Sequence, residues 1–154
     1  MDPKDDTLDK TVAEIQEAIL NEARSVYSER VIDHFLHPRN LGRMEDPDGS
    51  ARVTGPCGDT MHVFLKVSGG RVTEARFMTD GCASTIACGS IITELIKKKT
   101  ISEAVKVSAA DVIEASAGLP ASSVHCAVLA AQTLQEAISN LLFSQKGKDT
   151  KIHS

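Results

Sequence analysis

Aromatic side chains are scarce in this chain of 154 residues, which contains one Tyr, four Phe and no Trp. Its core must therefore be built mainly from Ile, Leu, Val and Ala, which favours helices packed on a small sheet. A chain of this length has room for one domain with a single modest core. The apolar fraction of 42% is ordinary for a soluble globular protein.

Long apolar runs are missing as well. No stretch approaches the roughly 20 apolar residues that cross a bilayer. The beginning of the chain, with Asp at positions 2, 5, 6 and 9, has neither a secretory apolar segment nor the Arg-rich, acid-poor pattern of a transit peptide. We therefore expect a cytoplasmic protein with no membrane partner.

Neither sign of charge dominates the sequence, whose formal net charge is -4. The compact basic run is Lys97-Lys98-Lys99, at a point where a helix is expected to end. Cations there complement the helix dipole. Because phosphate binding needs clustered Lys and Arg, we expect no nucleic-acid partner.

The N-terminal part of the chain has the spacing of amphipathic helices, with apolar residues mostly every three or four positions. They are Leu8, Val12, Ile15, Ile19, Ala23, Val26 and Ile32. The pattern predicts one helix from Thr7 to Phe35, or two with a break near Ser25. It ends before Pro38, because proline cannot continue the hydrogen-bond ladder. The stripe from Leu8 to Val26 is expected either to pack on its own domain or to contact a second copy of the chain or another protein.

A small antiparallel sheet is expected in the middle of the chain, after a loop at 39–48. Segments 61–67 and 72–78 have strand composition and flank Gly69-Gly70. Adjacent glycines take the positive φ angles of a tight hairpin turn. A short strand near 50–54 brings the sheet to three strands.

Helical spacing returns after the hairpin. The apolar residues of 86–96 predict a helix from Cys82 or Ala83 to about Lys98. Segments 100–103 and 108–111 have the form of capping boxes, so a short helix is expected after each. The last helix should begin near Ser123 or His125.

The expected fold class is therefore α+β: an antiparallel three-stranded sheet packed with about five helices, plus an N-terminal helical extension. The extension covers 1–24, the domain itself 25–144, and a flexible polar tail 145–154. Monomer and homodimer both remain open.

Paired cysteine motifs are also missing. The four cysteines are Cys57, Cys82, Cys88 and Cys126, and none forms a C-x-x-C pair. In a reducing compartment two disulfides are not expected, and metal or redox chemistry is the better interpretation. Closed structural zinc sites more usually contain C-x-x-C pairs.

Three segments place a metal-ligating side chain on a turn or a helix start. They are Gly55-Pro56-Cys57-Gly58-Asp59, Asp80-Gly81-Cys82-Ala83-Ser84 and His125-Cys126. A helix N-terminus carries unsatisfied N–H groups and partial positive charge, which favour thiolate over thiol. We therefore expect Cys82 and Cys126 to be reactive thiols that do not lie on buried faces.

Together these segments offer three thiolates, one imidazole and one carboxylate, more than one tetrahedral metal requires. Thiolate and imidazole suit zinc, iron and iron–sulfur clusters, whereas carboxylate is a hard ligand. A cluster held by three thiolates and one other ligand should be easier to remove than one held by four thiolates. The mixed set, Cys57, Asp59, Cys82, His125 and Cys126, therefore predicts a cluster site suited to release.

Several segments resemble one known family, the U-type iron–sulfur scaffolds (IscU and the N-terminal domain of NifU). The resemblance covers about 25–142 and rests on motifs in a fixed order. They are Tyr27-Ser28-Glu29-Arg30-Val31-Ile32-Asp33-His34-Phe35, His37-Pro38-Arg39-Asn40-Leu41-Gly42, Pro56-Cys57-Gly58-Asp59, Ala75-Arg76-Phe77, Gly81-Cys82-Ala83-Ser84, Leu119-Pro120 and His125-Cys126.

The resemblance implies a function and a role for each ligand. Such scaffolds are not classical enzymes: they receive sulfur from a cysteine desulfurase, assemble a labile [2Fe–2S] cluster from iron and that sulfur, and transfer it to apo-proteins. Cys57, Cys82 and Cys126 correspond to the cluster thiolates, and Cys126 to the persulfide acceptor. Asp59 corresponds to the carboxylate associated with lability and His125 to an alternative fourth ligand. Zinc binding is implied for the cluster-free form.

The sequence departs from the family pattern at three places. Bacterial members have Leu-Pro-Pro-Val-Lys before His-Cys, where a dedicated DnaK-type chaperone docks. This chain has Leu119-Pro120-Ala121-Ser122-Ser123-Val124, so that partner is not expected. The N-terminal extension is longer than usual, which separates Tyr27 from the terminus. Cys88 replaces a small residue and does not share a helix face with Cys82, so it is interpreted as a buried core residue.

Two other functions remain as alternatives. A structural or storage zinc protein would bind one zinc per chain and unfold on chelation. A thiol hydrolase or redox enzyme would use Cys126 with His125.

Overall fold

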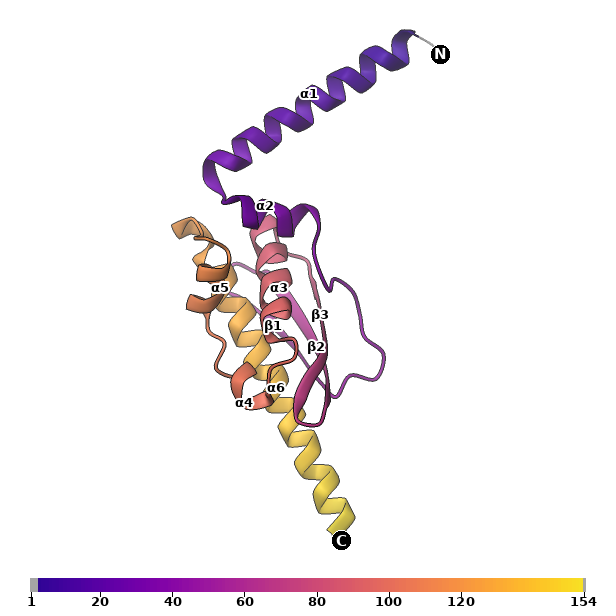
Figure 1. Ribbon diagram of the computed structural model, residues 1–154, viewed down its shortest axis with the longest axis vertical. Coiled ribbons are helices and arrows are strands. Elements are labelled where there is room, and N and C mark those ends of the chain that lie inside the picture. The colour runs from indigo at the N-terminus through magenta and orange to yellow at the C-terminus, as the bar shows by residue number, and fades with distance from the viewer. Residues whose placement is uncertain (1–2, 154) are drawn as a thin grey trace.

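A three-stranded antiparallel sheet with helices packed on one face forms the body of the protein (Figure 1). The computed structural model describes the backbone of residues 3–153 and the side chains of residues 8–145. The elements of the described backbone are α1 (Pro3–Val26), α2 (Glu29–Leu36), β1 (Gly49–Thr54), β2 (Thr60–Ser68), β3 (Arg71–Thr79), α3 (Ala83–Ile96), α4 (Ile101–Ala104), α5 (Ala109–Ala115), the 3-10 helix η1 (Ala121–Ser123) and α6 (Val124–His153). The predicted α+β class and three-stranded sheet are confirmed.

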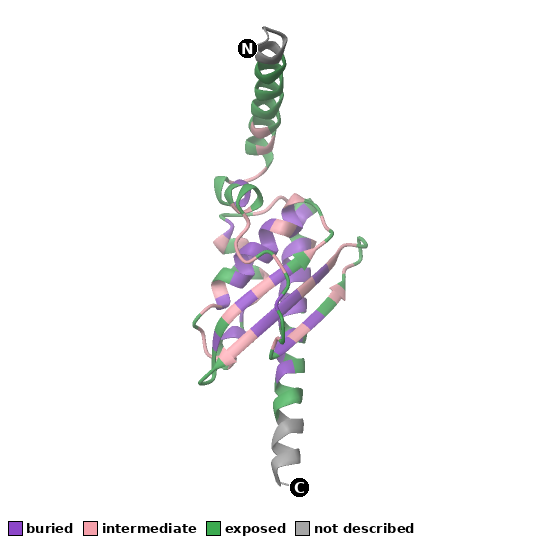
Figure 2. Cartoon of the chain, turned by 90° about the vertical axis from the view of Figure 1, so that its right-hand side faces the viewer, coloured by how far each residue is buried: buried purple, intermediate pink, exposed green. Residues whose placement is uncertain are grey.

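The sheet has the order β1-β2-β3, with β2 in the centre. Val63 of β2 pairs with Ala51 on one side and Phe77 on the other. Alternating residues of β2, such as Met61, Val63 and Leu65, are completely buried, as the alternation of a half-covered strand requires. Figure 2 shows this buried central strand. Gly69 and Gly70 have φ angles of 61° and 75° and form the predicted hairpin turn.

The break in the N-terminal helical segment lies at Tyr27–Ser28, close to the predicted position. The Ser28 side chain caps α2 by accepting a hydrogen bond of 3.1 Å from the N–H of Val31. Its hydroxyl also donates to the carbonyl of Ser116 at the end of α5. Ser28 therefore lies at the change of direction between α1 and α2, caps α2 and attaches it to the domain.

Helix α1 projects away from the sheet and its covering helices (Figures 1 and 2). Its apolar stripe is exposed; the exposed members are Leu8, Val12, Ile15, Ile19 and Val26. The alternative that this stripe packs on its own domain is therefore wrong, because α1 turns away at Tyr27 and contacts little beyond α2.

Helix α3 lies across the sheet and α6 crosses β1 and β2, so the core forms between these two helices and the strands. Both predicted capping boxes are present, at Thr100 with Glu103 and at Ser108 with Asp111. In each, the two side chains satisfy backbone N–H groups that helix geometry leaves unpaired.

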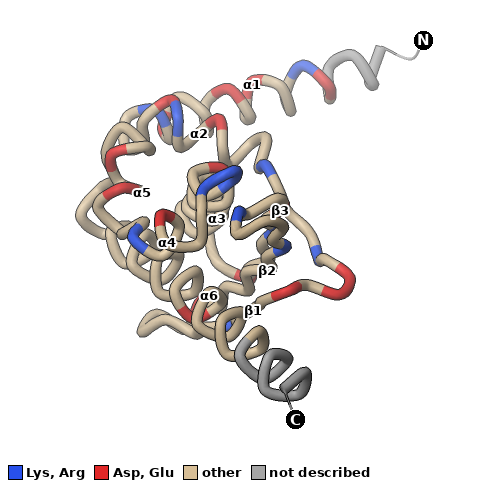
Figure 3. The backbone as a smooth tube through the Cα atoms, turned by 60° about the horizontal axis from the view of Figure 1, so that its bottom comes forward, with Lys and Arg blue, Asp and Glu red and all other residues tan. Residues whose placement is uncertain are grey.

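Helix α6 continues to His153, through the segment predicted as a flexible tail. That tail, 145–154, falls beyond the described side chains except at its first residue. Within the described chain, none of the helices combines the length and apolarity that a bilayer crossing needs. Acidic and basic residues are distributed over several elements of the described backbone (Figure 3).

Candidate metal centre

Three of the five predicted ligands meet where the β1–β2 loop lies beside the first turn of α6. One ligand atom each from Asp59, His125 and Cys126 lies within 4.8 Å of the other two. The sulfur of Cys126 is 3.6 Å from Nε2 of His125. Asp59 and His125 are half-buried and Cys126 is buried, so the cluster lies between core and solvent.

The loop that carries Cys57 and Asp59 is a tight turn between β1 and β2. The N–H of Gly58 donates to the carbonyl of Gly55 at 3.0 Å, and the N–H of Gly55 donates to the carbonyl of Asp59 at 2.8 Å. Gly58 has a φ of 86°, in the region that favours glycine. Cys57 therefore lies at an exposed turn, while Asp59 lies at the point where β2 begins.

Cys82 occupies the N-cap position of α3 and is exposed. Burial raises the pKa of this thiol, but hydrogen bonds from the backbone N–H groups of Thr85 and Ser84, together with contact with the hydroxyl of Thr85, outweigh it. The pKa of Cys82 is therefore lowered from its ordinary value, as expected for a sulfur at a helix N-terminus.

Cys126 contradicts the expectation of an accessible, acidic thiol. Only 1% of this residue is exposed. Burial raises its pKa, contact with the hydroxyl of Thr85 lowers it, and the neighbouring Cys82 raises it again, so the pKa lies above the ordinary value. Burial in the core therefore outweighs the helix N-terminus at this position.

Cys57 and Cys82 lie outside the group of ligand atoms that are within 4.8 Å of one another. Cys82 borders this group, because its sulfur lies 3.6 Å from the hydroxyl of Thr85, which also bonds to Asp59. The structure thus brings Asp59, His125 and Cys126 together, places Cys82 at their edge and leaves Cys57 at the rim.

Thr85 is the site residue that the sequence analysis missed. Its hydroxyl lies 3.0 Å from Oδ2 of Asp59 and 3.3 Å from the sulfur of Cys126. The available signal was its position three residues after Cys82, on the same face of the helix. A threonine inside a helix otherwise has no feature that distinguishes it from an ordinary helical residue.

A set of three hydrogen-bonded hydroxyls lies next to the site. Ser84 is buried, lies 3.1 Å from the hydroxyl of Tyr27 and is 3.0 Å from the hydroxyl of Ser123. These three residues come from the α1–α2 junction, the first turn of α3 and η1. They join the segments that flank Cys82 and Cys126.

Cys88 takes no part in the site. It is completely buried, and burial together with the neighbouring Cys126 and Cys82 raises its pKa to about 12. Its interpretation as a core residue is confirmed.

The site offers sulfur, nitrogen and carboxylate oxygen within bonding range of one ion. Thiolate and imidazole are ligands for zinc and iron, and a carboxylate adds a harder, more exchangeable donor. The residues present therefore suit a transition-metal ion.

The sequence matches the family described as the NifU-like N terminal domain over residues 26–148. The chain belongs to this family. The match spans the sheet, the helices that cover it and every residue of the candidate site.

Named relatives in the family cover most of the chain. It is 46% identical over 128 residues to the iron–sulfur cluster assembly scaffold protein IscU 1 of Archaeoglobus fulgidus, which covers 82% of this chain and 83% of the relative. It is 39% identical over 127 residues to the iron–sulfur cluster assembly scaffold protein IscU of Escherichia coli, which covers 79% of this chain and 98% of the relative.

A solved family structure has the same fold. The N-terminal NifU-like protein of Brucella abortus superposes with a TM-score of 0.60 at 19% identity, which covers 77% of this chain and 95% of that one. At this identity the likeness establishes the fold alone.

Proposed function

We propose that this protein is a scaffold on which an iron–sulfur cluster is assembled and from which it is handed to apo-proteins. Membership of the NifU-like N-terminal domain family, with IscU scaffold relatives over most of the chain, supports the role. The observation that carries the proposal is the meeting of Asp59, His125 and Cys126 at a half-open site.

The cargo is a [2Fe–2S] cluster bound through Cys57, Cys82 and Cys126, with Asp59 and His125 competing for the remaining coordination position. The mixed donor set supports this assignment, because a hard carboxylate is a weak partner for an iron that otherwise has sulfur ligands. Asp59 and His125 both lie close enough to Cys126 to serve the same ion. In the cluster-free form the same donors would hold zinc.

Sulfur arrives from a cysteine desulfurase as a persulfide on that enzyme's cysteine. The thiolate of Cys126 attacks the outer sulfur, so that an S–S bond forms on Cys126, the S–S bond of the desulfurase breaks, and the desulfurase cysteine leaves as thiolate. Because Cys126 is 1% exposed, the groups that cover it must move before the persulfide reaches it. A thiol reductant then supplies two electrons to convert the transferred sulfur to cluster sulfide.

We propose that residues 25–144 form the scaffold domain and 1–24 an extension of it. The projecting α1 supports this division. The protein works as a cargo carrier and not as a classical enzyme. Its four free cysteines suit a reducing compartment, and we place it in the cytoplasm for that reason.

Anaerobic reconstitution tests the proposal. The chain is incubated with a cysteine desulfurase, cysteine, a thiol reductant and ferrous iron, and is then studied by ultraviolet–visible and Mössbauer spectroscopy. We expect a [2Fe–2S] cluster to form on the parent chain. The cluster should be lost in Cys82→Ser and retained in the matched control Cys88→Ala. Retention of one zinc per chain with no cluster would support a structural zinc protein. A metal-independent activity abolished by Cys126→Ser would support a thiol enzyme.

A further inference from the structure

The hydroxyl of Thr85 contacts side chains from three separate segments of the candidate site. It lies 3.0 Å from Oδ2 of Asp59, 3.3 Å from the sulfur of Cys126 and 3.6 Å from the sulfur of Cys82. Asp59 comes from the β1–β2 loop, Cys126 from α6 and Cys82 from the start of α3. Thr85 itself is completely buried.

The position of this hydroxyl is fixed by packing. A Cβ on Gly81 would lie 2.7 Å from both Cβ and Oγ1 of Thr85, so the threonine side chain lies directly against the glycine backbone. The N–H of Gly81 is held in turn by the hydroxyl of Thr79 at 3.1 Å. Because threonine is also stiff about its first side-chain torsion, the hydroxyl has little freedom to turn away from the site.

The hydrogen-bonding capacity of a hydroxyl decides what Thr85 does there. It has one proton to donate, whereas an ionised carboxylate only accepts. The short contact with Oδ2 therefore orients the carboxylate of Asp59, and no hydrogen bond from a described side chain reaches its other oxygen, Oδ1. The lone pairs of that second oxygen can therefore serve another partner, such as a metal ion.

We propose that Thr85 is a positioning residue whose hydroxyl holds the Asp59 carboxylate beside Cys126, with one oxygen free to bind incoming metal. The proposal rests on the proposed function, since it takes Asp59 as a ligand of the cargo. It assigns to Thr85 the hydrogen bond that sets the direction of a ligand, and such bonds typically change metal affinity by 10- to 100-fold when removed.

Cobalt binding to the cluster-free protein tests this role. Thr85→Val removes the hydroxyl and keeps the branched shape, whereas Thr85→Ser keeps the hydroxyl and removes a methyl group. We expect Thr85→Val to weaken Co²⁺ binding by roughly tenfold or more and to alter the visible absorption bands of the bound ion. Thr85→Ser should bind within about twofold of the parent chain, since the ligand-orienting bond is kept.

A double-mutant cycle separates positioning from general damage. On an Asp59→Ala background, Thr85→Val should cause no further loss of Co²⁺ affinity, because the group it acts through is gone. A loss that persists on that background overturns the proposal, and so does unchanged binding by Thr85→Val. If the valine variant does not fold, Thr85→Ala replaces it, with the same expected outcomes and with circular dichroism to verify folding.

The two proposals can fail separately. If Asp59→Ala binds Co²⁺ as tightly as the parent chain, Asp59 is not a ligand and the role of Thr85 falls, even where cluster assembly succeeds. If the parent chain assembles no cluster but its Co²⁺ binding depends on Thr85 through Asp59, the scaffold proposal fails and the positioning role stands.

Discussion

The ring of Phe77 on β3 lies directly against the backbone of Gly89 on α3, and a Cβ at position 89 would overlap the ring atoms. Both residues are buried. This contact seats α3 directly on the sheet, and the N-terminal end of the same helix carries Cys82 and Thr85 to the site. The glycine therefore matters for the placement of ligands as well as for the core.

Gly89→Ala should destabilise the fold. Overpacking a core costs about 1–3 kcal/mol, whereas alanine in place of glycine within a helix gains about 1 kcal/mol. Because the overlap falls on a fully buried ring, we expect the overpacking cost at the upper end, about 3 kcal/mol, and so a net loss of about 2 kcal/mol in the free energy of unfolding, measured by urea denaturation. The double variant Gly89→Ala with Phe77→Leu should lose less free energy of unfolding than the two single variants lose in sum. Full parental stability of Gly89→Ala would contradict this packing.

The four thiols should differ in their rates of alkylation in the cluster-free protein. Cys57 and Cys82 are exposed, whereas Cys88 and Cys126 are buried. Since thiolate is the reactive form, the lowered pKa of Cys82 shifts its alkylation profile to lower pH, and the raised pKa of Cys126 shifts its profile to higher pH. Cys88, with a pKa of about 12, should stay unmodified while the chain is folded.

Iodoacetamide labelling at several pH values, followed by peptide mass spectrometry, measures these rates. Addition of urea supplies the control, because it should make all four thiols react alike. Labelling of Cys88 as fast as Cys82 in the folded protein would contradict the assignment of Cys88 to the core.

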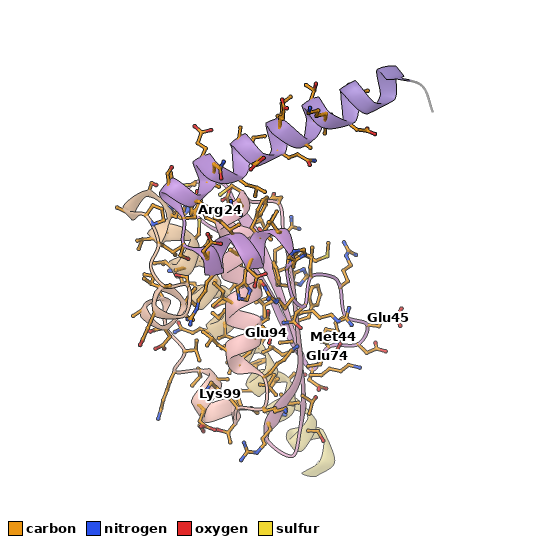
Figure 4. The ribbon with its side chains drawn as sticks, turned by 45° about the horizontal axis from the view of Figure 1, so that its top comes forward. Arg24, Met44, Glu45, Glu74, Glu94 and Lys99 are labelled. Carbon is orange, nitrogen blue, oxygen red and sulfur yellow. The ribbon has the colours of Figure 1, made fainter. Side chains whose placement is uncertain are left out.

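Asp59→Ala should give a more persistent cluster, because the hard, exchangeable ligand is lost while the thiolates remain. The decay of visible absorbance after addition of a chelator measures the lifetime, and we expect it to lengthen several-fold. Glu45→Ala is the matched control: Glu45 is an exposed acidic residue in the loop before β1 (Figure 4). Faster cluster loss in Asp59→Ala would argue against its role in release.

Removal of residues 1–24 should leave the scaffold domain folded. The shortened chain loses the ion pair of 3.3 Å between Arg24 and Glu29, but exposed pairs contribute at most about 1 kcal/mol. It keeps Tyr27 and its hydrogen bond with Ser84. We expect a melting temperature within about 4 °C of the full chain. A larger decrease would show that the extension is part of the domain.

Local chemistry made much of this fold predictable. The paired glycines 69 and 70 specify the hairpin, and the capping boxes at Thr100 and Ser108 specify two helix starts, because each signal acts over a few residues. The alternation of apolar residues along β2 likewise identifies its buried face. The family resemblance is confirmed by the match over residues 26–148.

What escaped prediction depends on contacts between distant segments. The burial of Cys126 follows from packing of α6 against α3 and the sheet, which no signal beside His125 reveals. The role of Thr85 appears only when Asp59 and Cys126 are brought to it from 26 and 41 positions away. The exposure of the α1 stripe follows from the direction in which the chain leaves Tyr27, and helical periodicity contains no information about that direction.

The proposed thiolate ligands differ in depth, with Cys126 in the interior and Cys57 and Cys82 outside. For a scaffold this gradient gives an order to the departure of its cargo. A recipient's thiol would meet the side held by Cys57 and Cys82 first, while Cys126 would still hold the cargo from the interior. Under the proposed function, handover would then proceed by successive exchange of bonds, without release of free iron between donor and recipient.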